Sequence, residues 1–286
     1  MVYNNYMKRS RIVFLCVLGF VAFLWCISGT AGIGGSGNIP ADAKGPADEI
    51  RKDNLKSTIE MLERYGERSS WKKQSEAIAW ARGQFEKLGI PCWIETYESD
   101  GKTWPNLFAR IEGKKDPSAL IMVIAHIDSK SSDPEREAPG ADDNGTGVAV
   151  LLEVARVLRQ YSPGDSIQFC LFTNEERGSK GSKAFARMAR AQGQDIKAVI
   201  NLDTLGYNRP LKSFDWDALW VRGSLKGKKQ AMSQMVKNLR RPMPGGKDVL
   251  IVGGRPANGK LVKVVGDRIR ESSGIPVKEI VHDGAC

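Results

Sequence analysis

The sequence predicts an α/β fold in which helices cover both faces of a mixed, mostly parallel central sheet. Three observations support this prediction. Strand-like and helix-like patterns alternate between residues 107 and 202, as is typical of α/β domains. One strand pattern, residues 120–125, is a continuous apolar run of the kind found in strands buried on both faces. Acidic residues and a histidine follow the strand patterns, where open α/β sheets bind their ligands.

Four segments have the apolar spacing of helices. Residues 47–65 and 74–88 form a first pair, which we expect to cover one face of the sheet. Residues 147–161 and 181–191 form a second pair. In the third segment the apolar residues recur with the helical period: Val148, Leu151, Leu152, Ala155 and Leu158. The glycine-rich turn before this segment therefore leads directly into a helix.

Four strands are predicted, and polar residues follow three of them. The strands are residues 107–111, 120–125, 166–172 and 198–202. His126 follows the second strand, Glu175 and Glu176 follow the third, and Asp203 follows the fourth. These side chains lie where the strands of an α/β sheet end, which makes them candidates for a functional site.

The N-terminal part is expected to direct the protein out of the cytoplasm. Lys8, Arg9 and Arg11 precede residues 12–33, which carry no charge. A helix of twenty-two residues is about 33 Å long and can cross a bilayer, with the basic residues on the cytoplasmic side. The same pattern fits a signal peptide cleaved near residues 29–31. An anchored and a secreted protein both remain open, and either places the domain in a periplasmic or extracellular compartment.

The organisation follows from these segments. We expect a basic cytoplasmic N-terminus at residues 1–11, an anchor or signal peptide at 12–33, a linker at 34–46 and one globular domain at 47–286. The net charge of +10 is scattered through residues 209–278 without a recognised nucleic-acid motif. We therefore expect a solvated basic face and no nucleic acid partner, with attraction to anionic lipid or cell-wall polymer as the functional alternative.

The residue types at the strand ends fit a metal-dependent hydrolase. Zinc takes imidazole and carboxylate ligands, and a two-metal site needs a carboxylate shared between ions about 3.5–4 Å apart. His126, Asp143, Glu176 and Asp203 supply those types. Each alone has a structural explanation, because aspartates commonly cap turns and paired glutamates commonly begin solvated helices. The combination favours a metal site.

Four short motifs carry a resemblance to a known family. They are Ala-His-Ile-Asp-Ser at 125–129, Gly-Ala-Asp-Asp-Asn-Gly-Thr-Gly at 140–147, Glu-Glu-Arg-Gly at 175–178 and Asn-Leu-Asp at 201–203. In this order they resemble the di-zinc aminopeptidases of metallopeptidase family 28, over residues 55–206. The resemblance implies an exported bacterial zinc peptidase that hydrolyses N-terminal residues from peptides with a free amino terminus.

The resemblance also implies a role for each residue. Asp143 would bridge two zinc ions, His126 and Asp203 would bind one of them, and Glu176 would bind the other. Glu175 would be the general base that takes a proton from the attacking water. Asp128 would orient the imidazole without binding metal. The family further implies a cis peptide bond between residues 143 and 144.

Two departures from the family pattern stand out. Thr204 occupies a position where the family often has methionine. The family takes a second histidine ligand from a C-terminal Ser-Asp-His segment, and the only other histidine here is His282, which lacks that context. We expect the domain to be C-terminally incomplete, with the second zinc bound weakly and activity impaired.

Two other functions remain as alternatives. Glutaminyl-peptide cyclases share this fold and use one zinc, although the residues around Asp143 and Glu175 look more like those of the peptidases. Other relatives keep the fold without the metals and act as binding domains. Side-chain preference and oligomeric state are not predicted.

Overall fold

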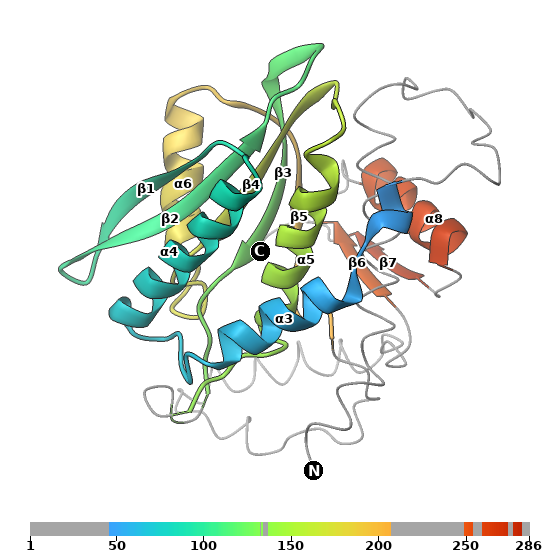
Figure 1. Ribbon diagram of the computed structural model, residues 1–286. Coiled ribbons are helices and arrows are strands. Elements are labelled where there is room, and N and C mark those ends of the chain that lie inside the picture. The colour runs from blue at the N-terminus through green and yellow to red at the C-terminus, as the bar shows by residue number, and fades with distance from the viewer. Residues whose placement is uncertain are drawn as a thin grey trace, which may run out of the picture.

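The central element is a five-stranded mixed sheet, which confirms the predicted fold class. The computed structural model describes residues 46–131, 133, 137–206, 249–253, 259–273 and 277–281. The strands of this sheet are β1 (Cys92–Ser99), β2 (Lys102–Ile111), β3 (Asp116–His126), β4 (Asp165–Phe172) and β5 (Asp195–Asn201). Their order is β1-β2-β4-β3-β5 (Figure 1). The β1–β2 and β2–β4 pairs are antiparallel, whereas β3 pairs in parallel with both β4 and β5.

The first strand and its hairpin were missed at the sequence level. Strand β1 pairs with β2 from Cys92 opposite Ala109 to Ser99 opposite Lys102. The two residues between the strands, Asp100 and Gly101, have φ angles of 52° and 69°. An Asp-Gly pair is favoured in such tight hairpin turns because both central residues need a positive φ. This dipeptide was the sequence signal for the hairpin. In the structure, the strand predicted at residues 107–111 begins earlier, at residue 102.

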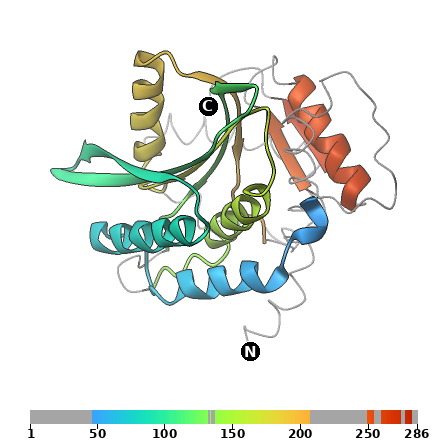
Figure 2. The same cartoon turned by 45° about the horizontal axis from the view of Figure 1, so that its top comes forward.

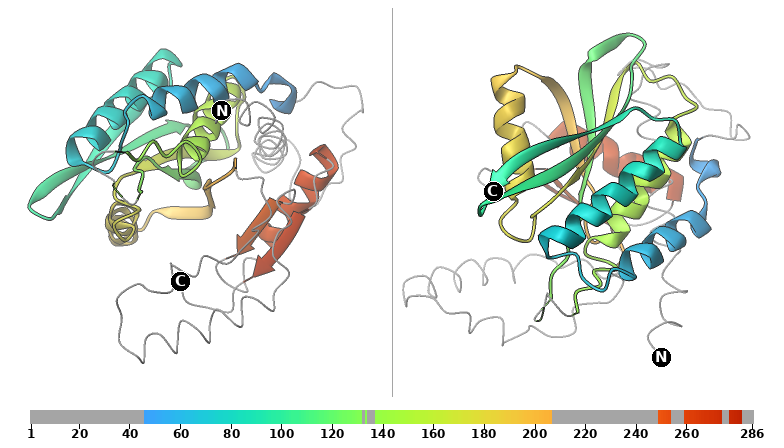
Figure 3. Two further views of the ribbon diagram at one scale, coloured as in Figure 1. Left: turned by 90° about the horizontal axis from the view of Figure 1, so that it is seen from below. Right: turned by 60° about the vertical axis from the view of Figure 1, so that its left-hand side comes forward.

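Helices cover both faces of the sheet, as predicted. Helices α3 (Lys52–Glu63), α4 (Trp71–Lys87) and α5 (Gly145–Leu158) pack on one face, where they share a continuous apolar core with β2, β3 and β4. Helix α6 (Lys180–Ala191) covers the other face through Phe185 and Ala189, which belong to one apolar cluster with Phe108 and Cys170 of the sheet. Figure 2 and the left view of Figure 3 show α6 on the opposite side of the sheet from the other three helices.

The predicted helix at residues 47–65 is divided in the structure. A short 3-10 helix, η1 (Pro46–Glu49), is followed by extended backbone at Arg51, the N-cap of α3. The backbone N–H of Arg51 donates to the buried Glu153 carboxylate at 2.6 Å. Because this N–H bonds to a distant acceptor, it does not continue the earlier helical turn. Apolar spacing alone did not reveal this interruption.

The strand register brings the C-terminal ends of β3, β4 and β5 to one edge of the sheet. His126 is the last residue of β3 and pairs with Phe172, the last residue of β4. On the other side of β3, Ile124 pairs with Asn201, the last residue of β5. The segments that follow these three parallel strands therefore start beside one another. This is the edge at which open α/β sheets bind their ligands.

A second, two-stranded sheet is formed by the C-terminal part. Strands β6 (Val249–Gly253) and β7 (Val277–Val281) are parallel, and helix α8 (Gly259–Ser273) connects them. His282 and the segments 1–11, 12–33 and 34–45 lie outside the described residues. Among the helices of the described part, none is both long and apolar enough to span a bilayer.

Candidate metal centre

The centre is built around His126 at the end of β3. Its ring is buried, and its Nε2 lies 3.1 Å from Oδ1 of Asp143 and 3.7 Å from Oδ1 of Asp203. The structure thus brings together three of the predicted metal-binding residues, with one ligand atom from each within 4.8 Å of the others. The Asp143 and Asp203 side chains remain 53% and 40% exposed, so the cluster opens to solvent.

The chemistry and spacing of this cluster fit a zinc ion. Zinc binds imidazole nitrogen and carboxylate oxygen at about 2.0–2.2 Å in tetrahedral sites, which separates neighbouring ligand atoms by about 3.3–3.6 Å. The separations of 3.1 and 3.7 Å from Nε2 bracket that range. The donor set combines one imidazole with two carboxylates, and both groups are zinc ligand types.

Asp128 contacts the imidazole on the side away from Asp143 and Asp203. Nδ1 of His126 lies 3.2 Å from the backbone oxygen of Asp128 and 3.4 Å from its Oδ1. Two acceptors on this side favour a proton on Nδ1 and leave Nε2 facing Asp143 and Asp203. Burial works against the charged form of His126, but its hydrogen bonds to the three aspartates outweigh burial and raise the pKa of His126 to about 12. The surroundings therefore strongly favour a positive charge at this point.

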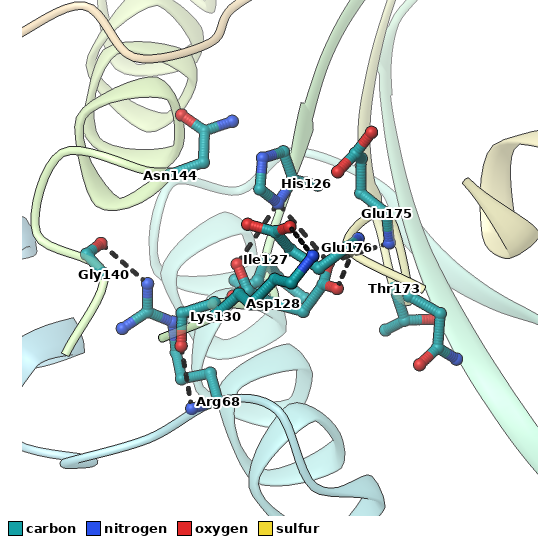
Figure 4. A network of polar contacts seen from close by, with 12 residues as sticks. Arg68, His126, Ile127, Asp128, Lys130, Gly140, Asn144, Thr173, Glu175 and Glu176 are labelled. Carbon is teal, nitrogen blue, oxygen red and sulfur yellow. Dashed lines mark hydrogen bonds and ion pairs between the residues drawn. The ribbon is translucent and has the colours of Figure 1, made fainter. Parts of the chain in front are cut away.

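Asp128 also holds the turn that carries the paired glutamates. Its Oδ1 accepts a hydrogen bond from the backbone N–H of Glu175, and its Oδ2 accepts one from Glu176, both at 3.0 Å. The Asp128 side chain is buried. Figure 4 shows these contacts, with the side chains of His126 and Glu175 above the segment that contains Asp128. One carboxylate thus joins the end of β3 to the turn after β4.

The two glutamates have different surroundings. Glu176 is mostly buried and lies 3.6 Å from the ammonium group of Lys130. Burial and the negative charge of Asp143 raise the pKa of Glu176. Glu176, the fourth predicted ligand, is not part of the three-residue cluster. Glu175 accepts a hydrogen bond from the Ser179 hydroxyl at 3.2 Å.

The turn that carries Asp143 is fixed by Asn144. The Asn144 side chain caps α5 by accepting from the backbone N–H of Gly147 at 3.0 Å, and it donates to the backbone oxygen of Leu202 at 2.8 Å. The peptide bond between Asp143 and Asn144 is cis, as the family resemblance implied. Gly147 has no room for a side chain, because a Cβ would lie 2.3 Å from the Asn144 carboxamide oxygen.

Hydrogen bonds join the turn that carries Asp203 to the turn that carries Asp143. Asp142 accepts a hydrogen bond from the backbone N–H of Gly206 at 2.7 Å, and the Thr146 hydroxyl accepts one from Leu205 at 3.0 Å. Thr204, the departure from the family pattern, donates to Asp203 at 2.8 Å. Burial opposes the charged form of Asp203, but hydrogen bonds from His126 and Thr204 hold the pKa of its carboxyl below the usual range.

Sequence reasoning missed the buried polar groups behind the glutamate turn. Asn174 has a φ of 56° and exchanges two hydrogen bonds with Gln74 of α4, while its side-chain amide donates to the Tyr97 hydroxyl of β1 at 2.8 Å. The same hydroxyl lies 3.2 Å from the backbone oxygen of Thr173. Arg68 is a further fully buried residue beneath the centre. A polar side chain within an otherwise apolar helical face, as at Gln74, was the signal available.

Comparisons with known proteins agree with this geometry. Residues 106–249, half of the 286-residue chain, match the model of Peptidase family M28. A probable zinc metalloprotease of Pyrenophora tritici-repentis is 28% identical over 186 residues, covering 56% of this chain and 43% of the relative. A probable leucine aminopeptidase of Trichophyton verrucosum is 30% identical over 182 residues, covering 60% and 50%.

The fold also resembles a solved structure. The LapA aminopeptidase of Legionella pneumophila superposes with a TM-score of 0.59 at 22% identity, covering 82% of this chain and 56% of that one. At this identity the likeness concerns the fold. The chain spans about two fifths to one half of the length of the two curated relatives.

Proposed function

Because this chain belongs to Peptidase family M28, a family of zinc-dependent metallopeptidases, we propose that it is an aminopeptidase that releases N-terminal residues from peptides. The observation that carries the proposal is the cluster of His126, Asp143 and Asp203 at the solvent-facing edge of the sheet. Exopeptidase activity is supported by the names of two similar proteins, the probable leucine aminopeptidase of Trichophyton verrucosum and the LapA aminopeptidase.

We propose that two zinc ions are held at this edge. His126, Asp143 and Asp203 would hold one, and Glu176 together with Asp143 would hold the other more weakly. Zinc bound there would act as a Lewis acid that polarises the scissile carbonyl and makes a water molecule more acidic. Asp143 suits a shared position, since its carboxylate lies beside His126 and its charge acts on Glu176.

Glu175 is the proposed general base. It would accept a proton from the water that attacks the peptide carbonyl and return that proton to the amine that leaves. The backbone hydrogen bond to Asp128 holds Glu175 beside the ring of His126. The Ser179 hydroxyl limits the rotation of the Glu175 carboxylate. Asp128 would act by orienting His126 and the glutamate turn.

The experiment compares Glu175→Gln with Glu176→Gln in the full chain. We expect Glu175→Gln to bind zinc like the wild type and to lose about 10²- to 10⁴-fold in kcat on an unblocked peptide substrate, the usual contribution of a general base. We expect Glu176→Gln to bind less zinc in a chelator competition. Full activity of the wild type on an N-acetylated peptide, or full activity of Glu175→Gln, would contradict the proposal.

The same assay separates the alternative functions. A peptide with N-terminal glutamine distinguishes release of the free amino acid from cyclisation without release, which is the glutaminyl-cyclase outcome. Zinc binding by the wild type without turnover of either kind would favour a non-catalytic binding domain. Chelator treatment should abolish turnover, and added zinc should restore it.

Export remains a proposal that rests on the sequence. We propose that residues 12–33 either anchor the protein in a membrane or are removed as a signal peptide, with peptides outside the cytoplasm as substrates. Mass determination of the mature N-terminus distinguishes the two, and protease accessibility of the domain in spheroplasts, in which the outer membrane has been opened, tests export. A domain that stays protected from protease in spheroplasts and is digested only after lysis would contradict export.

A further inference from the structure

Arg68 makes an unusual set of contacts beneath the metal centre. It follows α3 and its side chain is fully buried. Its guanidinium donates four hydrogen bonds, and every acceptor is a backbone carbonyl: Nε to Ile127 at 2.8 Å, Nη1 to Leu62 at 3.0 Å and to Pro139 at 2.6 Å, and Nη2 to Gly140 at 2.9 Å. In Figure 4, Arg68 lies on the opposite side of the 127–130 segment from the ring of His126.

The backbone around Arg68 joins the same segments. The N–H of Arg68 donates to the Ser129 hydroxyl at 3.0 Å, and that hydroxyl donates to the backbone oxygen of Ala138 at 2.6 Å. The N–H of Ala138 donates in turn to the oxygen of Gly66 at 2.9 Å. Residues 66–68 are therefore tied both to the segment after β3 and to residues 138–140.

These two segments carry the acidic groups of the centre. The first contains Asp128, directly after Ile127, and the second leads from Gly140 into the turn that contains Asp143. Gly140 packs closely against both neighbours, because a Cβ there would lie 2.5 Å from Cβ of Ser129 and 2.8 Å from Nη2 of Arg68. The separation of the two segments is thus set at the guanidinium.

The charge of Arg68 also acts on the centre. Burial lowers the pKa of Arg68 to about 10, while the negative charges of Asp128 and Glu63 oppose this shift, so the side chain remains charged at neutral pH. Within the described part of the chain, Arg68 forms no direct ion pair with a carboxylate. A buried cation is costly unless it is well hydrogen-bonded, and four carbonyls supply those bonds.

We propose that Arg68 is a positioning residue that holds the Asp128 and Asp143 segments at the spacing the metal centre needs. This inference rests on the proposed zinc site. A planar guanidinium can reach carbonyls in several directions at once, whereas a lysine ammonium is a single point on a flexible chain. The arrangement therefore requires arginine in particular, because a lysine would keep the positive charge but not all four hydrogen bonds.

The test is zinc affinity of the Arg68→Lys variant, measured by chelator competition on the full chain and paired with urea unfolding. Loss of groups that orient metal ligands usually weakens binding about 10- to 100-fold, and we expect a loss of this size. The matched control is Glu153→Gln. Glu153 is also buried and charged, but it bonds Arg51, Asn54 and Arg156 at the contact between α3 and α5. This control should lose stability and keep its zinc affinity.

The outcomes separate this inference from the proposed function. A wild type that binds no zinc contradicts the proposed function itself. A wild type that binds zinc, with a folded Arg68→Lys variant of equal affinity, overturns only the role of Arg68. If Arg68→Lys does not fold, Ser129→Ala removes the hydroxyl between Arg68 and Ala138, and its affinity should fall about fivefold, the equivalent of one net hydrogen bond. Unchanged affinity in that variant would overturn the inference.

Discussion

Replacing Asp128 with asparagine should weaken the contacts that join the end of β3 to the turn carrying Glu175 and Glu176. The buried Asp128 carboxylate accepts the backbone N–H groups of Glu175 and Glu176 with different oxygens, each at 3.0 Å. An asparagine side chain keeps one oxygen and places an NH₂ group where the other was. One of the two N–H groups then loses its acceptor and faces a donor. The imidazole of His126 also loses its charged neighbour.

The size of the effect follows from these contacts. A hydrogen bond to a charged group contributes about 1.5–3 kcal/mol, and the variant loses one of them outright. Less repulsion among the remaining carboxylates offsets a part of this loss. We expect Asp128→Asn to lower the free energy of unfolding by about 2 kcal/mol and to weaken zinc binding by about 10- to 100-fold.

Urea unfolding followed by circular dichroism measures the first quantity, and zinc titration against a competing chelator measures the second. The matched control is Asp116→Asn at the other end of β3. Asp116 also accepts the backbone N–H groups of Ser118 and Ala119, but in solvent. This control should lose less than about 1 kcal/mol and keep its zinc affinity. Equal results for the two variants would refute the reasoning.

Three further predictions test other parts of the structure. Gly147→Ala should destabilise the fold by about 3 kcal/mol, because its Cβ would lie 2.3 Å from the side-chain oxygen that caps α5. The control Gly83→Ala, which has open space around it, should stabilise α4 by about 1 kcal/mol. Equal urea midpoints for the two variants would contradict the close contact at Gly147. Tyr97→Phe removes the hydroxyl that accepts from Asn174, so it should cost about 1 kcal/mol and reduce kcat; unchanged turnover would argue against a role for this contact. Burial raises the pKa of Glu67, but hydrogen bonds from Ser69 and Ser70, just before α4, outweigh burial and hold this pKa below 4.5. Glu67 therefore stabilises the fold above that pH, and the stability difference between Glu67→Gln and the wild type should shrink as the pH falls below 4.5; a difference independent of pH would contradict this.

Much of the fold could be predicted because its signals are local. The helical period identified α5, and the predicted 166–172 strand differs from β4 by one residue. The β1–β2 hairpin was missed although Asp100 and Gly101 carry its turn signal, since β1 alternates partly buried with exposed side chains and has no continuous apolar run. The division before α3 was not predictable from spacing, because it depends on a bond between Arg51 and a residue 102 positions away.

The sequence by itself determined the α/β alternation and the types and order of the candidate metal-binding residues. Periodicity and side-chain chemistry are properties of short segments, so they can be recognised without a fold. Only the tertiary structure decided which groups meet. It placed Nε2 of His126 beside Asp143 and Asp203 and left Glu176 outside that cluster. It also placed Arg68 against carbonyls 59 and 72 positions away. Such contacts depend on strand register and on loops that pack through space, and no local pattern encodes them.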